Sequence, residues 1–170
     1  HWAEEVIKRV VSKGYMDLED KNFFPNREAT RLEFAKAVAK LAKANPDEYK
    51  DKEIFKDVVS GTEDAGYINW AYEKGIVKGN GEGQFEGNRE ITRQEIATIL
   101  NRYTNSMKMD LDKNEVAEYA DSDKIADWAR KDVKEATEKG IFSGKDNNMF
   151  DPLANITRAE VAKMVSASYK

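Results

Sequence analysis

The sequence contains no cysteine and only one histidine, the terminal residue His1. Without cysteine there is no disulfide bond, no thiolate nucleophile and no cysteine-ligated zinc site. A single histidine at the chain end also excludes a Ser-His-Asp triad and a histidine metal cluster. Carboxylate pairs remain as a catalytic arrangement, but the many Asp and Glu residues single out no pair. We therefore predict a protein that is not an enzyme and that has no metal or cofactor.

Long apolar runs and an excess of positive charge are also missing. No run approaches about 18 consecutive apolar residues, so the sequence predicts no membrane span. The formal net charge is -4, and no basic excess is available to displace counterions from nucleic acid, so we predict no nucleic-acid partner. Because the chain starts at His1 and not at Met, we expect it to be part of a longer protein. The lack of a signal peptide then carries no information.

What the sequence does contain is an internal repeat. The tetrapeptide Thr-Arg-x-Glu occurs three times, and a Lys-Gly pair and a phenylalanine precede each copy in the same order. An ordered set of features that recurs at a nearly constant long interval indicates repeated structural units. We predict three repeats that together form one compact module: residues 1–46, 54–107 and 118–170. Repeat one lacks a counterpart of Phe55–Val58 or Tyr119–Asp121, so we expect its front to be truncated and those residues to lie upstream of His1.

Each repeat predicts a helix, a loop and a second helix. The first helix ends at Lys-Gly, where glycine takes the left-handed conformation after the last turn. A loop phenylalanine (Phe24, Phe85 or Phe150) is expected to anchor in the core, and the segment Asp110–Glu118 is expected to form a short extra helix or turn. The second helices, which begin at Thr-Arg, are the most apolar segments and need partners. The predicted fold class is therefore all-α, with three helix-loop-helix repeats around a central three-helix bundle.

The Thr-Arg-x-Glu motif has a physical explanation for two of its residues. Thr and Glu form a capping box at a helix start, so Thr157→Ala should cost about 1 kcal/mol. The Arg faces the positive end of the helix dipole, which costs a few tenths of a kcal/mol. One explanation is that the Arg and free backbone N–H groups form an anion receptor. The other is that duplication copied a surface Arg. If Arg158 serves binding, Arg158→Ala should cost almost no stability.

Four motifs together resemble the S-layer homology family: Trp2–Glu5, Phe55–Val58, Lys74–Gly79 and Ile91–Glu95. The resemblance covers nearly the whole chain. It implies a pseudo-threefold arrangement in which the second helices form the central bundle. It also implies non-covalent anchoring of a bacterial surface protein to secondary cell wall polysaccharide, often pyruvylated, in grooves between repeats. The implied location is extracellular, at the cell wall or cell surface, with other surface-layer subunits as further partners through the rest of the protein.

The resemblance also implies roles for particular residue types. The motif arginines would bind a carboxylate through a bidentate fork, and an exposed indole would form an apolar platform for a sugar ring. The alternative for the tryptophans is core packing. Aspartates before the first helices would accept sugar hydroxyls, or else form a cap or turn. Loop glycines would let the backbone approach the ligand. The predicted polysaccharide-binding residues are Trp2, Arg31, Asp57, Gly79, Arg93, Asp121, Trp128, Gly144 and Arg158.

Two departures from the pattern weaken particular grooves. Repeat two has Glu63 where the other repeats have Trp, and repeat one has Leu18 at the place of the loop glycine. Repeat three keeps Trp128, Gly144 and Arg158, so a groove that involves this repeat is the best candidate, and the sequence leaves open which repeat supplies the Arg that completes it. The alternative function is a helical-repeat module that binds a protein partner or self-assembles in a surface layer.

Overall fold

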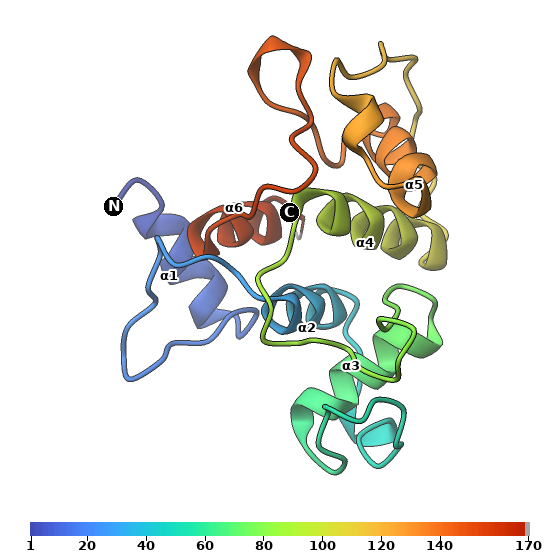
Figure 1. Cartoon of the computed structure of the whole chain (residues 1–170). Helices are drawn as coiled ribbons and strands as arrows, with labels where there is room; N and C mark the ends of the chain where they lie inside the picture. Colours follow the sequence, from blue (N-terminus) through green and yellow to red (C-terminus); the bar gives the residue numbers. More distant parts are fainter. Residues whose placement is uncertain (169–170) are drawn as a thin grey trace. The chain divides into compact units, whose positions relative to one another are not determined.

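The computed structural model describes residues 1–168, and the regular structure in this part of the chain is helical (Figure 1). Only isolated β-bridges occur among the described residues, so the all-α prediction is confirmed. None of the helices in this part of the chain combines the length and apolarity needed to span a membrane. The α-helices are α1 (Glu4–Ser12), α2 (Arg31–Leu41), α3 (Glu63–Glu73), α4 (Arg93–Ser106), α5 (Asp127–Glu138) and α6 (Arg158–Ser168). Three short 3-10 helices are η1 (Pro46–Glu48), η2 (Ser122–Lys124) and η3 (Asp146–Asn148).

The chain forms two compact units. Unit 1 contains His1–Ile91 and the C-terminal segment from Ile156 onward, and unit 2 contains Thr92–Asn155. In unit 1, α1 packs against α6, and α2 packs against both α3 and α6 (Figure 1). In unit 2, α4 packs against α5. The contact of α2 with α6 joins the second helices of repeats one and three, while the central three-helix bundle and its pseudo-threefold symmetry stay predictions.

Both units have apolar cores built from the predicted helix faces. The core of unit 1 includes Val10, Phe34, Val38, Ile68 and Val161, all at most 1% exposed. The core of unit 2 is a cluster on α4, α5 and the following loop: Ala97, Ile125, Ala129, Val133, Ala136 and Phe150. Burial of such side chains stabilises each unit by about 1.5–3 kcal/mol per large aliphatic or aromatic residue.

The helix ends follow the sequence signals. Complete capping boxes start α2 at Thr30 and α4 at Thr92, and Thr157 and Glu160 exchange the same two hydrogen bonds at the start of α6. Beyond α1, α3 and α5, three glycines adopt left-handed conformations with φ of 77°, 74° and 70°, namely Gly14, Gly75 and Gly140. Both predictions about helix termini are confirmed.

Two local predictions were wrong. In repeat one the buried loop anchor is Phe23, which is 7% exposed, whereas Phe24 is 43% exposed and has a positive φ of 53°. Aligning Pro25 with Pro152 would have identified the anchor, because Phe23 and Phe150 both stand two residues before a proline. The segment Asp110–Glu118 forms neither a helix nor a turn, but runs as an irregular strap.

Candidate functional site: the junctions between repeats

Each motif arginine reaches from its own helix start into the loop of another repeat. Arg158 of repeat three donates from Nε to the carbonyl of Phe23 at 2.8 Å and from Nη2 to the carbonyl of Asp17 at 2.7 Å, both in repeat one. Its guanidinium carbon also lies 4.5 Å from the centroid of the Phe23 ring. We call this arrangement junction 3–1, and it lies within unit 1.

The other two arginines repeat this geometry. In junction 1–2, also within unit 1, Arg31 donates to the carbonyls of Phe85 and Lys78 at 3.1 and 3.2 Å. In junction 2–3, within unit 2, Arg93 donates to the carbonyls of Phe150 and Ser143 at 2.8 and 2.7 Å. Each motif arginine therefore binds a loop of another repeat: the arginine of repeat one binds repeat two, that of repeat two binds repeat three, and that of repeat three binds repeat one. We call this pair of hydrogen bonds to loop carbonyls the arginine clamp.

The backbone N–H groups at these helix starts also have partners. The amides of Arg158 and Ala159 donate to the carbonyls of Arg27 and Pro25 at 2.8 and 3.0 Å. The equivalent amides at the starts of α2 and α4 donate to loop carbonyls in the same way, and the Thr caps take the third amide. The free backbone amides expected for an anion receptor are thus absent at these positions, which corrects that part of the sequence interpretation.

Arg158 is also fully engaged as a side chain. It is 3% exposed, and its remaining terminal nitrogen, Nη1, contacts the carboxylate of Glu33. Each of its three guanidinium nitrogens therefore has a protein acceptor. The near-neutral effect of Arg158→Ala that the sequence suggested no longer follows, because the substitution would leave buried carbonyl groups without a donor.

Asp57 and Asp121 hold the same loops from the opposite side. The two carboxylate oxygens of Asp121 each accept a backbone hydrogen bond at 2.8 Å, one from Phe150 and one from Asp151. Asp57 does the same for Phe85 and Glu86, also at 2.8 Å. These are long-range contacts to a loop, and Asp121 makes no side-chain cap bond at η2, so the local cap or turn expected as the alternative does not describe them. A bond from a sugar hydroxyl to either carboxylate stays a prediction.

Asp121 should make stability depend on pH. Burial raises its pKa, but the hydrogen bonds from Phe150 and Asp151 outweigh burial, so the pKa is lower than usual. A carboxyl with a lowered folded-state pKa contributes stability above its unfolded pKa, about 3.9, and loses it as pH falls through the folded value. We expect Asp121→Asn to cost about 2–4 kcal/mol at pH 7. Urea unfolding between pH 7 and 2 measures the free energy of unfolding, which should fall less steeply with falling pH in the variant than in the native chain. The same fall in both proteins would contradict this assignment.

The two loop glycines are required by close packing. A Cβ atom built on Gly144 would lie 2.5 Å from the Tyr119 ring and 2.6 Å from the carbonyl oxygen of Met149. A Cβ on Gly79 would lie 2.6 Å from the Phe55 ring. Real Cβ atoms do not approach other atoms so closely, so both glycines have a steric reason in the fold itself. An additional approach of a ligand to this backbone stays a prediction.

The tryptophans divide into exposed and buried positions. Trp2 at the start of α1 is 63% exposed and Trp128 at the start of α5 is 55% exposed, whereas Trp70 within α3 is 6% exposed. The core-packing alternative is therefore excluded for Trp2 and Trp128. Glu63 occupies the equivalent position at the start of α3.

The residue five positions after each motif arginine differs among the junctions. It is Lys163 after Arg158, Lys36 after Arg31 and Thr98 after Arg93. The Nζ atom of Lys163 lies 6.0 Å from the centroid of the Trp2 ring. Lys163 of repeat three therefore lies near the exposed indole of repeat one. Gly144 directly follows Ser143, which accepts from Arg93, so this glycine lies at the junction of Arg93 and not at that of Arg158.

A groove of about 220 Å³ in unit 1, which we call the Lys36 groove, is lined by Lys36 and Lys40 together with Arg158 and Asp17 of junction 3–1. Lys36 lies 2.7 Å from Asp64, and Lys40 lies 3.9 Å from Asp17. Burial lowers the pKa of Lys36, but the hydrogen bond and charge of Asp64 outweigh it, so the pKa is raised and Lys36 stays charged. The sequence interpretation missed both lysines, although their spacing on an otherwise apolar helix was a usable signal.

Comparison with known proteins identifies the family of the chain. The family model described as S-layer homology domain matches residues 1–35, 54–97 and 118–162. The chain belongs to the S-layer homology family. Membership in this family indicates a cell-wall anchoring module that is itself non-catalytic.

The relatives that share these S-layer homology repeats have varied names. An amylopullulanase of Thermoanaerobacterium thermosulfurigenes is 34% identical over 97% of this chain and 9% of its own length. The S-layer protein sap of Bacillus anthracis is 34% identical over 61% of this chain and 12% of its own length. A cellulosome-anchoring protein of Acetivibrio thermocellus is 29% identical over 86% of this chain and 33% of its own length. The chain therefore spans a minor part of each relative.

Proposed function

We propose that the chain anchors a bacterial surface protein to the cell wall by binding secondary cell wall polysaccharide, in particular a pyruvylated form. The observation that carries the proposal is the exposure of Trp2 and Trp128 at equivalent junction positions, while Trp70 is buried. An indole that is more than half exposed on a rigid helix start loses hydration of a large apolar face when it contacts a sugar ring. The names of the relatives, which include S-layer and cellulosome-anchoring proteins, support the same function.

The junction geometry suggests separate roles for the lysine, the tryptophan and the arginines. Lys163 beside Trp2 supplies a charge for a ketal carboxylate next to a platform for the ring. Arg158 is a positioning residue, because its hydrogen bonds hold the loop of repeat one in place. Arg31 and Arg93 hold the loops of the other two junctions in the same way. We propose junction 3–1 as the principal site and junction 2–3 as a second site without the lysine.

The direct test is co-sedimentation of the chain with purified bacterial cell walls, before and after the secondary polymer is removed. We expect the chain to sediment with intact walls and to stay in the supernatant with stripped walls. Binding that survives stripping would assign the receptor to peptidoglycan or a wall protein. Self-association without walls, seen by light scattering, would favour the alternative of a self-assembling module.

Substitution of the tryptophans should separate the two sites. We expect Trp2→Ala to weaken wall binding about 30-fold, the effect of losing a residue that contributes roughly 2 kcal/mol. Trp128→Ala should have a smaller effect, because Thr98 replaces the lysine at its junction. Met109→Ala removes another exposed apolar side chain, 45% exposed, and serves as the matched control. Equal binding by all three variants, measured with the same walls, would exclude the indole platforms.

A further inference from the structure

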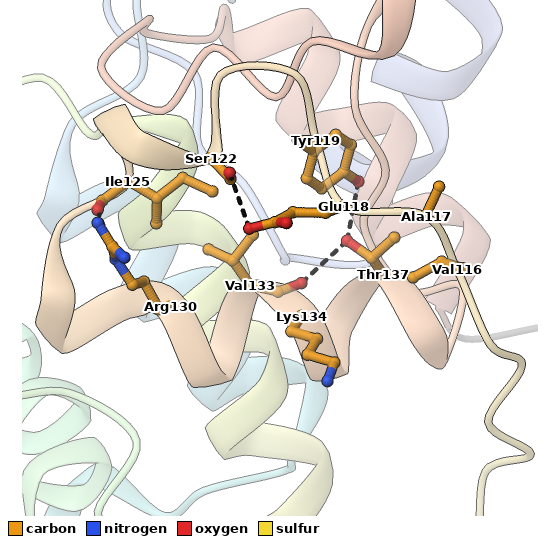
Figure 2. Close-up of a pocket in the computed structure, with 10 residues that line it drawn as sticks. All are labelled: Val116, Ala117, Glu118, Tyr119, Ser122, Ile125, Arg130, Val133, Lys134 and Thr137. Atoms are coloured by element: carbon orange, nitrogen blue, oxygen red, sulfur yellow. Dashed lines mark hydrogen bonds between the residues drawn. The ribbon is translucent and has the colours of Figure 1, made fainter.

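Repeat three contains a cavity that belongs to none of the three junctions. It has a volume of about 410 Å³ and lies between the irregular strap and α5 (Figure 2). Backbone hydrogen bonds hold the strap in its middle and just after its end, because the amide of Asn114 donates to the carbonyl of Glu138 at 2.9 Å and the amide of Ala120 to that of Asn148 at 2.8 Å. The cavity walls are Val116, Ala117, Glu118, Tyr119, Ser122, Ile125, Arg130, Val133, Lys134 and Thr137. Its size falls within the range of small-molecule sites, about 300–1,000 Å³.

Comparison with repeat two shows why the cavity is open. Counting back from the glycine that ends each first helix, Thr137 of repeat three corresponds to Tyr72 of repeat two. The Tyr72 ring packs edge-on against Phe55 with centroids 5.3 Å apart. In repeat three the counterpart of Phe55 is Tyr119, whose hydroxyl instead lies 2.8 Å from the Thr137 hydroxyl. A small residue at position 137 therefore leaves space where repeat two has an aromatic ring.

The cavity surface combines an apolar floor with charged groups. Val133 and Ile125 are buried apolar residues, and the Tyr119 ring forms a wall (Figure 2). One Glu118 oxygen accepts from the Ser122 hydroxyl at 2.9 Å, which leaves the second carboxylate oxygen to accept from a ligand. The cavity also has two cationic lining residues, Arg130 and Lys134, against this one carboxylate.

The two cationic side chains differ in whether a carboxylate pairs with them. Arg130 lies 3.2 Å from the carboxylate of Asp127 and donates to the carbonyl of Ile125. Lys134 has no ion-pair partner within 4.0 Å among residues 1–168 and therefore offers the charge that is available to a ligand. Because Asp127 pairs with Arg130, the surface has no net excess of cations, and Lys134 is the cationic group that an anionic ligand would contact.

We propose that this cavity binds a carboxylate-bearing sugar residue. The apolar face of the pyranose ring would lie on the Tyr119 ring, a ring hydroxyl would donate to Glu118, and the carboxylate would face Lys134. An acidic peptide fits less well. One of its carboxylates could contact Lys134, but its other carboxylates would face the carboxylate of Glu118 and be repelled by it. The inference rests on the proposed function in that the secondary cell wall polysaccharide would supply a carboxylate-bearing sugar, but the cavity is separate from the three junctions. N-acetylmuramic acid serves only as a soluble probe of this class, because peptidoglycan holds its carboxylate in an amide bond and stripped walls would not offer it.

The test is an amide NMR titration of the whole chain with N-acetylmuramic acid and N-acetylglucosamine. The two sugars share a ring and an acetamido group, and only the first carries a lactyl carboxylate. We expect N-acetylmuramic acid to shift the amides of Glu118, Ser122, Val133 and Thr137 and to bind about three- to tenfold tighter than the neutral sugar, the range expected for one partly exposed charge contact. Lys134→Gln should remove this preference.

Thr137→Tyr fills the cavity with the residue that repeat two uses and should abolish the shifts, while Thr137→Ser keeps the hydroxyl and should preserve them. Equal affinity for the two sugars, or no shifts at the solubility limit, would overturn the proposal. Larger shifts with an acetyl-capped Asp-Glu dipeptide would overturn the sugar class. Failure here is distinguishable from failure of the proposed function, because Thr137→Tyr should still sediment with walls and Trp2→Ala should still bind N-acetylmuramic acid.

Discussion

Arg158→Ala is expected to reduce the free energy of unfolding by about 3–5 kcal/mol, which is the range for removing one partner of a buried charged network. The substitution would leave the carbonyls of Phe23 and Asp17 without the donors that they have at 2.8 and 2.7 Å. It would also leave Glu33, whose side chain is 19% exposed, without its contact to the guanidinium. Urea unfolding followed by far-UV circular dichroism measures the change.

Two matched variants make this prediction specific. Thr157→Ala alters the adjacent residue and removes only the helix cap, so it should cost about 1 kcal/mol. Arg158→Lys keeps the charge but has one ammonium group in place of a planar fork, so it should be clearly less stable than the native chain. If Arg158→Ala destabilised no more than Thr157→Ala, the clamp would contribute little to stability.

The location of Arg158 makes this loss larger than a local effect. It joins α6, close to the C-terminal end, to a loop of repeat one, and α6 also packs against α1. The clamp therefore links Arg158 to Phe23, which are more than a hundred residues apart in the sequence. Loss of this contact should weaken the packing of α6 on repeat one and make unit 1 unfold at a lower denaturant concentration.

The sequence predicted the parts of the fold that depend on local chemistry. The Thr and Glu of each motif bond within their own helix start, so four consecutive residues contained all the information needed. The Arg was different, because its acceptors are backbone carbonyls in another repeat and every residue type has such a carbonyl. Nothing in the sequence marks Lys78 or Ser143 as an acceptor, so the arginine was assigned to an external anion instead.

The sequence could nominate the tryptophans of the candidate site, but not the residues that they would lie beside. Trp2 and Trp128 could be proposed from their equivalent places before the Lys-Gly pairs, and their exposure agrees with a role at the surface. Which arginine meets which tryptophan depends on the order in which the repeats pack, which no local pattern encodes. Lys163 was missed because a single lysine on an exposed helix position is common, and only its distance to the Trp2 ring makes it notable.

Gly144→Ala is expected to cost about 3 kcal/mol, which is a large effect for a single methyl group. The new methyl would meet the Tyr119 ring at 2.5 Å and the Met149 carbonyl oxygen at 2.6 Å. The ring could move, but the carbonyl is fixed because Met149 accepts the amide of Lys145 at 2.7 Å. Because Ser143 precedes this glycine and accepts from Arg93, the strain would also disturb junction 2–3.

Gly140→Ala separates steric from conformational effects in the same loop. Gly140 has a left-handed φ of 70° and nothing within 4 Å of its added Cβ, so alanine there should cost about 1–2 kcal/mol through the backbone alone. Combining Gly144→Ala with Tyr119→Leu should recover part of the steric loss, with a coupling of about 1 kcal/mol. Urea unfolding of the single and double variants measures this coupling. Strict additivity would show that the Tyr119 ring is not the obstacle and that the Met149 carbonyl alone requires glycine.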